Sequence, residues 1–149
     1  MKFSAAVLSA ISVAVASASV IGQRDDNPVF KVTGFSGSCI EHSTQCSLEF
    51  SYQTANGNMP SPVRCSDLRN AKGTGMIADI PEWEGKCENS ASWAFIRENT
   101  GFTIKITMPD SPASNTTGHA TLPATDFVTR SNNVNTIEYY KGTPCFNLY

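Results

Sequence analysis

Alternating apolar and polar residues are the clearest pattern in the chain, and they predict β-strands. Leu48, Phe50 and Tyr52 alternate with polar residues, which is typical of a strand with one buried face and one solvated face. The same alternation runs through residues 102–108 and follows another apolar run at residues 93–97. The four residues between these two runs include Asn and Gly, which tolerate the positive φ of tight turns. The two runs therefore predict a β-hairpin.

Further short runs extend the β prediction to the whole chain. Residues 29–35 form a third predicted strand, and no amphipathic helix is evident beyond a single turn at residues 66–71. Weaker strand candidates are residues 62–65, 76–80, 119–122, 134–140 and 145–148. Many short strands separated by Gly, Pro and Asn are typical of an all-β fold, here a compact antiparallel β-barrel or sandwich.

The first residues of the chain have the pattern of a secretory signal peptide. Lys2 precedes an uncharged run at residues 5–16, and residues 16–18, Ala-Ser-Ala, form a small-x-small cleavage site. The apolar run is too short to span a bilayer core of about 30 Å. We therefore expect a secreted, extracellular protein without stable membrane insertion.

This pattern also divides the chain. Residues 1–18 are the predicted signal peptide, and residues 19–28 form a polar, flexible N-terminal segment in which Arg24 could mark a second processing site. Residues 29–149 show no repeat, linker or low-complexity tract, so they predict a single β-barrel domain.

Charge argues against a nucleic-acid partner. Removing the signal peptide takes away one basic residue, Lys2, and leaves 10 basic and 13 acidic residues, a net charge of −3. The basic residues are dispersed along the sequence, whereas proteins that bind polyanions usually carry them in clusters.

The five cysteines predict disulfides, because export places them in an oxidising compartment. Two bonds among five cysteines allow about 15 arrangements, so the sequence does not fix the pairing. Cys65 and Cys87 bracket a long segment rich in Gly, and Cys39 and Cys46 bracket a polar turn between two strands. Cys145 is the odd residue, which could pair with Cys39, cross-link two subunits or remain a buried thiol.

Several short motifs occur in a fixed order between residues 29 and 125. They are the strand at 29–35, the Val-Arg-Cys-Ser run at 63–66, the Gly-Lys-Cys-Glu-Asn-Ser run at 85–90, the turn at 99–101, the strand at 102–108 and the Ala-Thr-Leu-Pro run at 120–123. In this combination the chain resembles the Alternaria major-allergen-like family of secreted fungal proteins. It looks closer to the members that elicit a hypersensitive response in plants than to the allergen itself.

The resemblance implies a compact antiparallel β-barrel, a role outside the fungal cell and a disulfide between Cys65 and Cys87. Family members have been associated with plant defence proteins and with flavonoid-like ligands. No motif in this chain identifies either interaction.

The chain also departs from the family pattern. The allergen has a cysteine before its first strand that links two subunits, whereas residues 25–28 contain none. It has a second disulfide in its C-terminal half, where this chain has only Cys145. We therefore expect a monomer in which a bond between Cys39 and Cys46 replaces the second disulfide.

The best candidate recognition surface is the predicted connection at residues 78–86. Trp83 lies there among charged residues, and Trp is enriched at binding hot spots, whereas Trp93 in a predicted strand is expected in the core. The acidic candidates beside Trp83 are Asp79, Glu82 and Glu84. Trp83 could equally cap an open end of the barrel.

Catalysis has weaker support in the sequence. His42 and His119 are the only histidines, and neither has the spacing of a metal site. Glu41, His42 and Arg97 have the residue types of a secreted ribonuclease, although Glu41 and His42 belong to a polar turn. We therefore assign no catalytic residue, metal or cofactor and expect the protein not to be an enzyme.

One modification motif stands out. Asn115 begins an Asn-Thr-Thr run that fits the acceptor pattern for N-glycosylation. The preceding residues, 109–112, include two prolines and have the composition of a surface loop. The sequence therefore predicts a glycosylation site at Asn115.

The predicted function combines these features. We expect a secreted fungal elicitor that triggers plant defence by binding an extracellular or membrane protein of the plant host. The alternatives are a small secreted enzyme such as a ribonuclease, or a carrier of a small apolar ligand in the mouth of the barrel.

Overall fold

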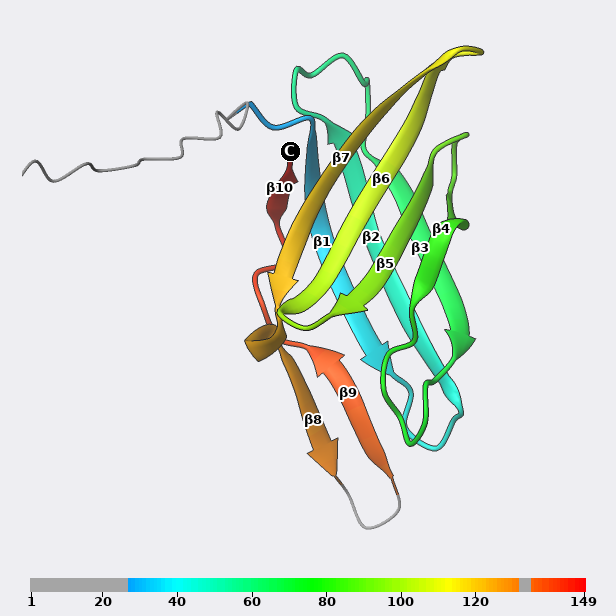
Figure 1. Ribbon diagram of the computed structural model, residues 1–149, viewed down its shortest axis with the longest axis vertical. Coiled ribbons are helices and arrows are strands. Elements are labelled where there is room, and N and C mark those ends of the chain that lie inside the picture. The colour runs from blue at the N-terminus through cyan, green and yellow to red at the C-terminus, as the bar shows by residue number, and fades with distance from the viewer. Residues whose placement is uncertain (1–26, 132–134) are drawn as a thin grey trace, which may run out of the picture.

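Antiparallel strands form a nearly closed barrel in the computed structural model, which describes residues 27–131 and 135–149 (Figure 1). The strands are β1 (Phe30–Cys39), β2 (Gln45–Thr54), β3 (Val63–Asn70), β4 (Ile80–Cys87), β5 (Ser92–Glu98), β6 (Gly101–Ser111), β7 (Ser114–Pro123), β8 (Phe127–Ser131), β9 (Thr136–Tyr140) and β10 (Phe146–Leu148). A short 3-10 helix, Ala124–Asp126, joins β7 to β8. The all-β prediction is confirmed. The predicted signal peptide, the site at Arg24 and residues 19–26 lie outside the described residues.

The strands pair mostly with their neighbours in sequence. Their order in the sheet is β7-β6-β5-β4-β3-β2-β1-β9-β8, and β10 pairs with β1 off this path. The hairpin predicted from residues 93–97 and 102–108 is β5 and β6, whose ladder runs from Ser92↔Thr107 to Glu98↔Gly101.

The end of the chain brings the two sides of the barrel together. In β10, Leu148 pairs with Phe30 of β1, and the next residue, Tyr149, exchanges two backbone hydrogen bonds with His119 of β7, at 2.9 and 3.0 Å. Gly118 of β7 is close to this seam, because a Cβ there would lie 2.9 Å from the Phe30 ring. The short β10 therefore connects the first strand of the barrel with the seventh.

Aromatic rings fill the interior of the barrel. Phe35 contacts Phe50, Phe95 and Phe146, and Phe95 stacks on Phe102 with ring centroids 4.3 Å apart. Such ring pairs combine a large buried apolar area with favourable edge and face geometry. The barrel thus encloses its own side chains.

The hairpin of β8 and β9 projects beyond the barrel wall (Figure 1). One registered residue pair, Ser38↔Tyr139, joins β9 to β1. Aromatic packing attaches the hairpin more firmly, since Phe127 contacts Phe102 at 4.4 Å and Tyr140 contacts Phe35 at 4.9 Å between ring centroids.

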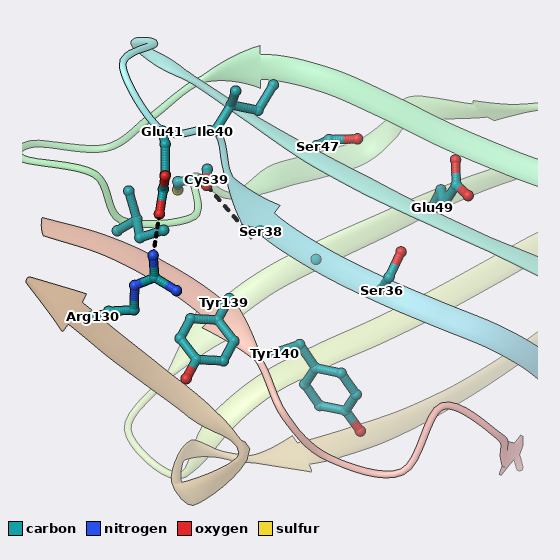
Figure 2. A pocket seen from close by; sticks show the side chains of 12 residues that line it. Ser36, Ser38, Cys39, Ile40, Glu41, Ser47, Glu49, Arg130, Tyr139 and Tyr140 are labelled. Atoms are coloured by element: carbon teal, nitrogen blue, oxygen red, sulfur yellow. Dashed lines mark hydrogen bonds and ion pairs between the residues drawn. The ribbon is translucent and has the colours of Figure 1, made fainter. Parts of the chain in front are cut away.

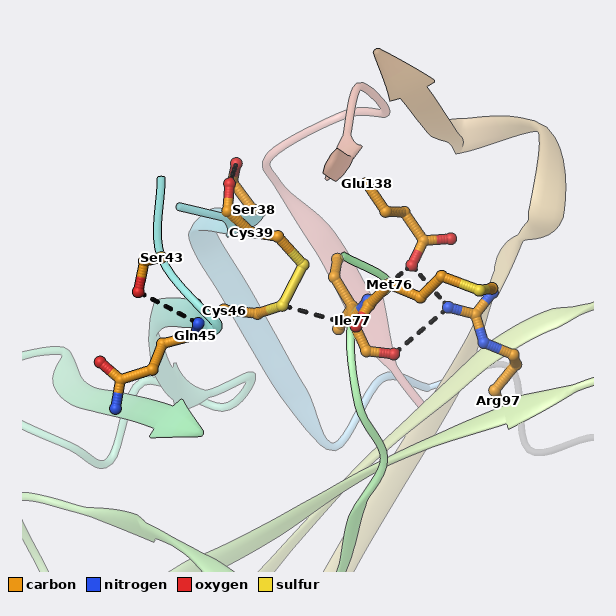
Figure 3. The surroundings of a disulfide bond; sticks show 9 residues. All are labelled: Ser38, Cys39, Ser43, Gln45, Cys46, Met76, Ile77, Arg97 and Glu138. Carbon is orange, nitrogen blue, oxygen red and sulfur yellow. Dashed lines mark hydrogen bonds and ion pairs between the residues drawn. A yellow bond between two sulfur atoms is a disulfide. The ribbon is translucent and has the colours of Figure 1, made fainter. Parts of the chain in front are cut away.

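A buried ion pair provides the second attachment of this hairpin. Glu138 of β9 is 4% exposed and accepts a 2.5 Å hydrogen bond from the Arg97 guanidinium of β5. The same carboxylate oxygen accepts the backbone N–H of Ile77 at 2.8 Å (Figure 3). Arg97 also lies over the Phe102 ring. Strand β5, the segment before β4 and the hairpin therefore meet at one carboxylate.

Both disulfides join residues that face each other across a ladder. Cys39 bonds to Cys46 at the β1–β2 turn, and Cys65 bonds to Cys87 between β3 and β4. The two expected pairings are confirmed. Cys145 is an exposed free thiol, so the alternatives that it pairs with Cys39 or lies buried are wrong.

Several local predictions were wrong. Residues 76–79 are irregular apart from an isolated bridge between Met76 and Lys72, whereas the following residues form β4. Residues 66–70 continue β3 instead of forming a helical turn. Strand β8 was not predicted. Trp93 is 1% exposed and belongs to the core, as expected.

We expect both disulfides to stabilise the fold, in the order of the chain length that each one closes. Cys65 and Cys87 are 22 residues apart in the sequence, whereas Cys39 and Cys46 are 7 residues apart. Loop entropy then predicts losses of about 3 and about 2 kcal/mol when each pair is replaced by Ser. Denaturant unfolding of the two double variants measures both losses, and a larger loss for the Cys39–Cys46 pair would contradict this account.

Removing the buried carboxylate should cost far more than removing an exposed one. Glu138→Ala leaves the Arg97 guanidinium without its carboxylate partner and the Ile77 N–H without its acceptor, so we expect a loss of about 3 kcal/mol in the free energy of unfolding. Glu82→Ala is the matched control, because Glu82 forms a surface ion pair with Lys105, and we expect a loss below about 1 kcal/mol. Equal losses in urea titrations would show that Glu138 does not anchor the hairpin.

Candidate functional site

Trp83 lies in an irregular part of β4 instead of a free loop. Register pairs join Ile80 to Phe95 and Gly85 to Trp93, so five steps along β4 match only two along β5. The extra residues form a bulge, and Trp83 adopts a left-handed backbone conformation with φ of 72°. That conformation is an outlier for a bulky residue. The prediction that residues 78–86 form a connection was therefore wrong for most of its length.

The bulge presents the Trp83 side chain to solvent. Trp83 is 55% exposed, which makes it one of the two most exposed large apolar residues of the part of the chain described, together with Leu68 on the neighbouring strand β3. A small crevice beside Trp83 is lined by Glu82, Ala94 and Thr107. The indole thus stands on the outer wall of the barrel and does not cap its end.

Ion pairs surround Trp83 and hold the bulge. The Lys86 ammonium donates a 2.7 Å hydrogen bond to the Trp83 carbonyl oxygen. Lys105 of β6 pairs with Glu82 at 2.7 Å, and Arg69 of β3 pairs with Glu84 at 3.3 Å. A lysine of β6 and an arginine of β3, one on each side of β4 in the sheet, therefore neutralise the two acids that flank the indole.

Asp79 has a structural role at the start of β4. One of its carboxylate oxygens accepts the backbone N–H of Arg97 at 2.8 Å, and the other lies 3.5 Å from the Lys72 ammonium. The sequence placed Asp79, Glu82 and Glu84 together with Trp83. In the structure each of these acids has a cationic or backbone partner, so the surface around the indole carries little uncompensated charge.

Arg69 is an organising residue that the sequence did not reveal. Its guanidinium makes a two-point contact with the Asp67 carboxylate, at 2.8 and 2.9 Å, and donates to the Asp79 carbonyl oxygen at 2.9 Å. The hydrogen bond to Asp67 raises the pKa of Arg69 above its ordinary value. Registered pairs between β3 and β4 end at Ser66↔Lys86, so Arg69 bridges the two strands where their ladder stops.

Two of the residues considered for a ribonuclease, Glu41 and Arg97, form ion pairs with different partners. Glu41 pairs with Arg130 of β8 at 2.6 Å, whereas Arg97 pairs with Glu138. His42 has a positive φ of 62° in the turn closed by the Cys39–Cys46 disulfide. His119 is exposed on β7, at the seam with the C-terminus, which matches the edge position considered for it.

Other expected features have clear positions. Asn115 is exposed near the start of β7, pairs with Pro109 and therefore lies in a strand and not in a loop. No cluster of three or more His, Cys, Asp or Glu suited to a metal ion occurs among residues 27–131 and 135–149. No helix within the same ranges has the length and apolar character needed to cross a membrane.

Comparisons with known proteins add no relative. No protein-family model, curated protein or solved structure matches the chain. The likeness to the Alternaria major-allergen-like family stays a prediction from short motifs.

Proposed function

We propose that the protein is a secreted fungal elicitor that triggers plant defence responses by binding a host protein outside the cell or at its membrane. The observation that carries this proposal is the exposed indole of Trp83 in the β4 bulge. The motif resemblance to hypersensitive-response elicitors supplies the biological setting. The two disulfides are typical of proteins that work in an oxidising compartment, which supports secretion.

Trp83 has the properties of a binding hot spot. Trp is enriched among residues that dominate protein interfaces, because a large rigid ring buries much area at low entropic cost. Around it, the pairs Glu82–Lys105 and Glu84–Arg69 form a polar rim without strong net charge. A partner can therefore cover the indole without leaving an isolated charge buried.

The backbone at Trp83 supports a prearranged site. A left-handed conformation at a Trp costs about 1 kcal/mol or more and persists only where surrounding contacts impose it. Those contacts include the Lys86 hydrogen bond and the Cys65–Cys87 disulfide at the end of β4. A rigid anchor loses less entropy on binding than one on a flexible loop.

Two substitutions at position 83 separate the contribution of the side chain to binding from the contribution of the backbone conformation to stability. We expect Trp83→Ala and Trp83→Gly to raise the dose needed for a plant defence response about 30-fold, which corresponds to about 2 kcal/mol of binding free energy. Glycine accepts a φ of 72°, so Trp83→Gly should unfold at about 1 kcal/mol higher free energy than Trp83→Ala. Dose–response curves in leaves and urea unfolding measure the two effects.

Matched controls separate recognition from catalysis and from misfolding. Tyr149→Ala removes another exposed aromatic ring, and we expect an unchanged response. His42→Ala and His119→Ala should also leave the response intact. A folded His42→Ala protein without activity would favour the enzyme alternative, and full activity of both Trp83 variants would refute the proposed anchor.

A further inference from the structure

A groove lies on the outer face of the barrel, where the β8–β9 hairpin leaves β1. Because a single registered pair, Ser38↔Tyr139, connects β9 to β1, the hairpin diverges and a space of about 550 Å³ opens beside it. This volume is within the range of about 300–1,000 Å³ that is typical of ligand sites.

The floor and wall of the groove have distinct chemistry. Ser36 and Ser38 of β1 and Ser47 of β2 line the floor, and Tyr139 of β9 lines the opposite wall (Figure 2). Ile137 of β9 also belongs to the lining. A serine hydroxyl donates one hydrogen bond and accepts others. The Ser38 hydroxyl donates to the Cys39 carbonyl oxygen at 3.0 Å, so it offers acceptor positions to a ligand. The groove therefore combines a row of hydroxyls with two aromatic residues of β9, Tyr139 and Tyr140.

Two carboxylates complete the lining. Glu41 closes one end through its 2.6 Å ion pair with Arg130 (Figure 2). Glu49 pairs with Arg64 at 2.6 Å. Both carboxylates are more than 40% exposed, and an ionised carboxylate has about four acceptor positions, so each can accept further hydrogen bonds. The lining thus offers both donors and charged acceptors.

We propose that this groove binds a neutral oligosaccharide. Sugar hydroxyls donate and accept hydrogen bonds, which matches serine hydroxyls and carboxylates, and the apolar C–H face of a sugar ring packs well on an aromatic ring such as Tyr139. Anionic ligands fit less well, because the Arg130 guanidinium in the lining is already paired with Glu41, and the Arg64 guanidinium is already paired with Glu49. Apolar ligands would bury hydroxyls and carboxylates without partners, which is costly.

The site is held from the opposite face of β9. Successive strand residues point to opposite sides, so Tyr139 faces the groove while Glu138 is buried against Arg97. The floor is fixed by the Cys39–Cys46 disulfide at its end. The floor and the wall of the groove therefore both belong to elements that are anchored in the free protein, as a preorganised binding site requires.

Oligosaccharide titrations monitored by NMR and calorimetry test the proposal. The purified protein is titrated with hexamers of β-1,4-linked glucose, β-1,3-linked glucose and β-1,4-linked N-acetylglucosamine, and with a galacturonic acid hexamer as the charged comparison. We expect saturable binding of at least one neutral hexamer, with shifts at Ser38 and Tyr139. The preferred linkage and sugar unit together distinguish cellulose-like, callose-like and chitin-like sources.

Variants decide whether the groove is responsible. We expect Tyr139→Ala to weaken binding about tenfold and Ser36→Val to weaken it as well, because the first removes the aromatic face and the second one hydroxyl. Tyr149→Ala and Trp83→Ala should bind like the original protein, so this test is independent of the proposed elicitor surface. Thermal unfolding checks that each variant is folded.

Three results would overturn the proposal. They are no binding of any neutral hexamer at millimolar concentration, tighter binding of the galacturonic acid hexamer than of all neutral ones, and unchanged affinity in folded Tyr139→Ala.

Discussion

The barrel depends on the pairing of the two ends of the folded domain. Phe30, at the start of β1, pairs with Leu148 of β10, and the adjacent Tyr149 bonds to His119 of β7. Without this strand, β1 and β7 would expose unpaired backbone groups along facing edges, which is a liability for any sheet. The last residues of the chain thus convert a meander of strands into a nearly closed barrel.

The two surfaces with proposed roles lie where regular strand pairing fails. At β4 the bulge around Trp83 interrupts the ladder with β5, and ion pairs hold the irregular segment in place. At β9 the single pair with Ser38 lets the hairpin diverge, while the buried Arg97–Glu138 contact keeps it attached. Both sites therefore combine local irregularity with a rigid support, which is how folds commonly carry binding sites.

Sequence periodicity predicted the regular parts of this fold well. Residues 102–108 alternate because one face of β6 is buried, so both the strand and its hairpin with β5 were predictable. Strand β4 was not predictable, because residues 81–84 are all exposed and buried and exposed residues do not alternate through the bulge. Irregular strands lack the signal on which such predictions depend.

Long-range contacts explain why less of the candidate site was predictable. Trp83 was selected correctly as an exposed residue, yet the acids beside it were read as a charged surface. Their partners are distant in sequence, since Lys105 is 23 residues from Glu82 and Arg69 is 15 residues from Glu84. Likewise, the groove joins β1 and β2 to residues some 90 positions later, and Glu41 meets Arg130 across 89 residues. Only the folded topology brings these groups together.

The central claim is that the protein acts through direct contact of the β4 bulge with a host protein, and site-specific photo-crosslinking tests it most directly. A benzophenone amino acid is placed at position 83 or, for comparison, at the exposed position 149, and each protein is irradiated with extracellular and membrane fractions of leaves. We predict a discrete adduct from position 83 that excess original protein suppresses and excess Trp83→Ala protein does not. Adducts of equal yield from both positions, or equal suppression by the two competitors, would contradict the claim.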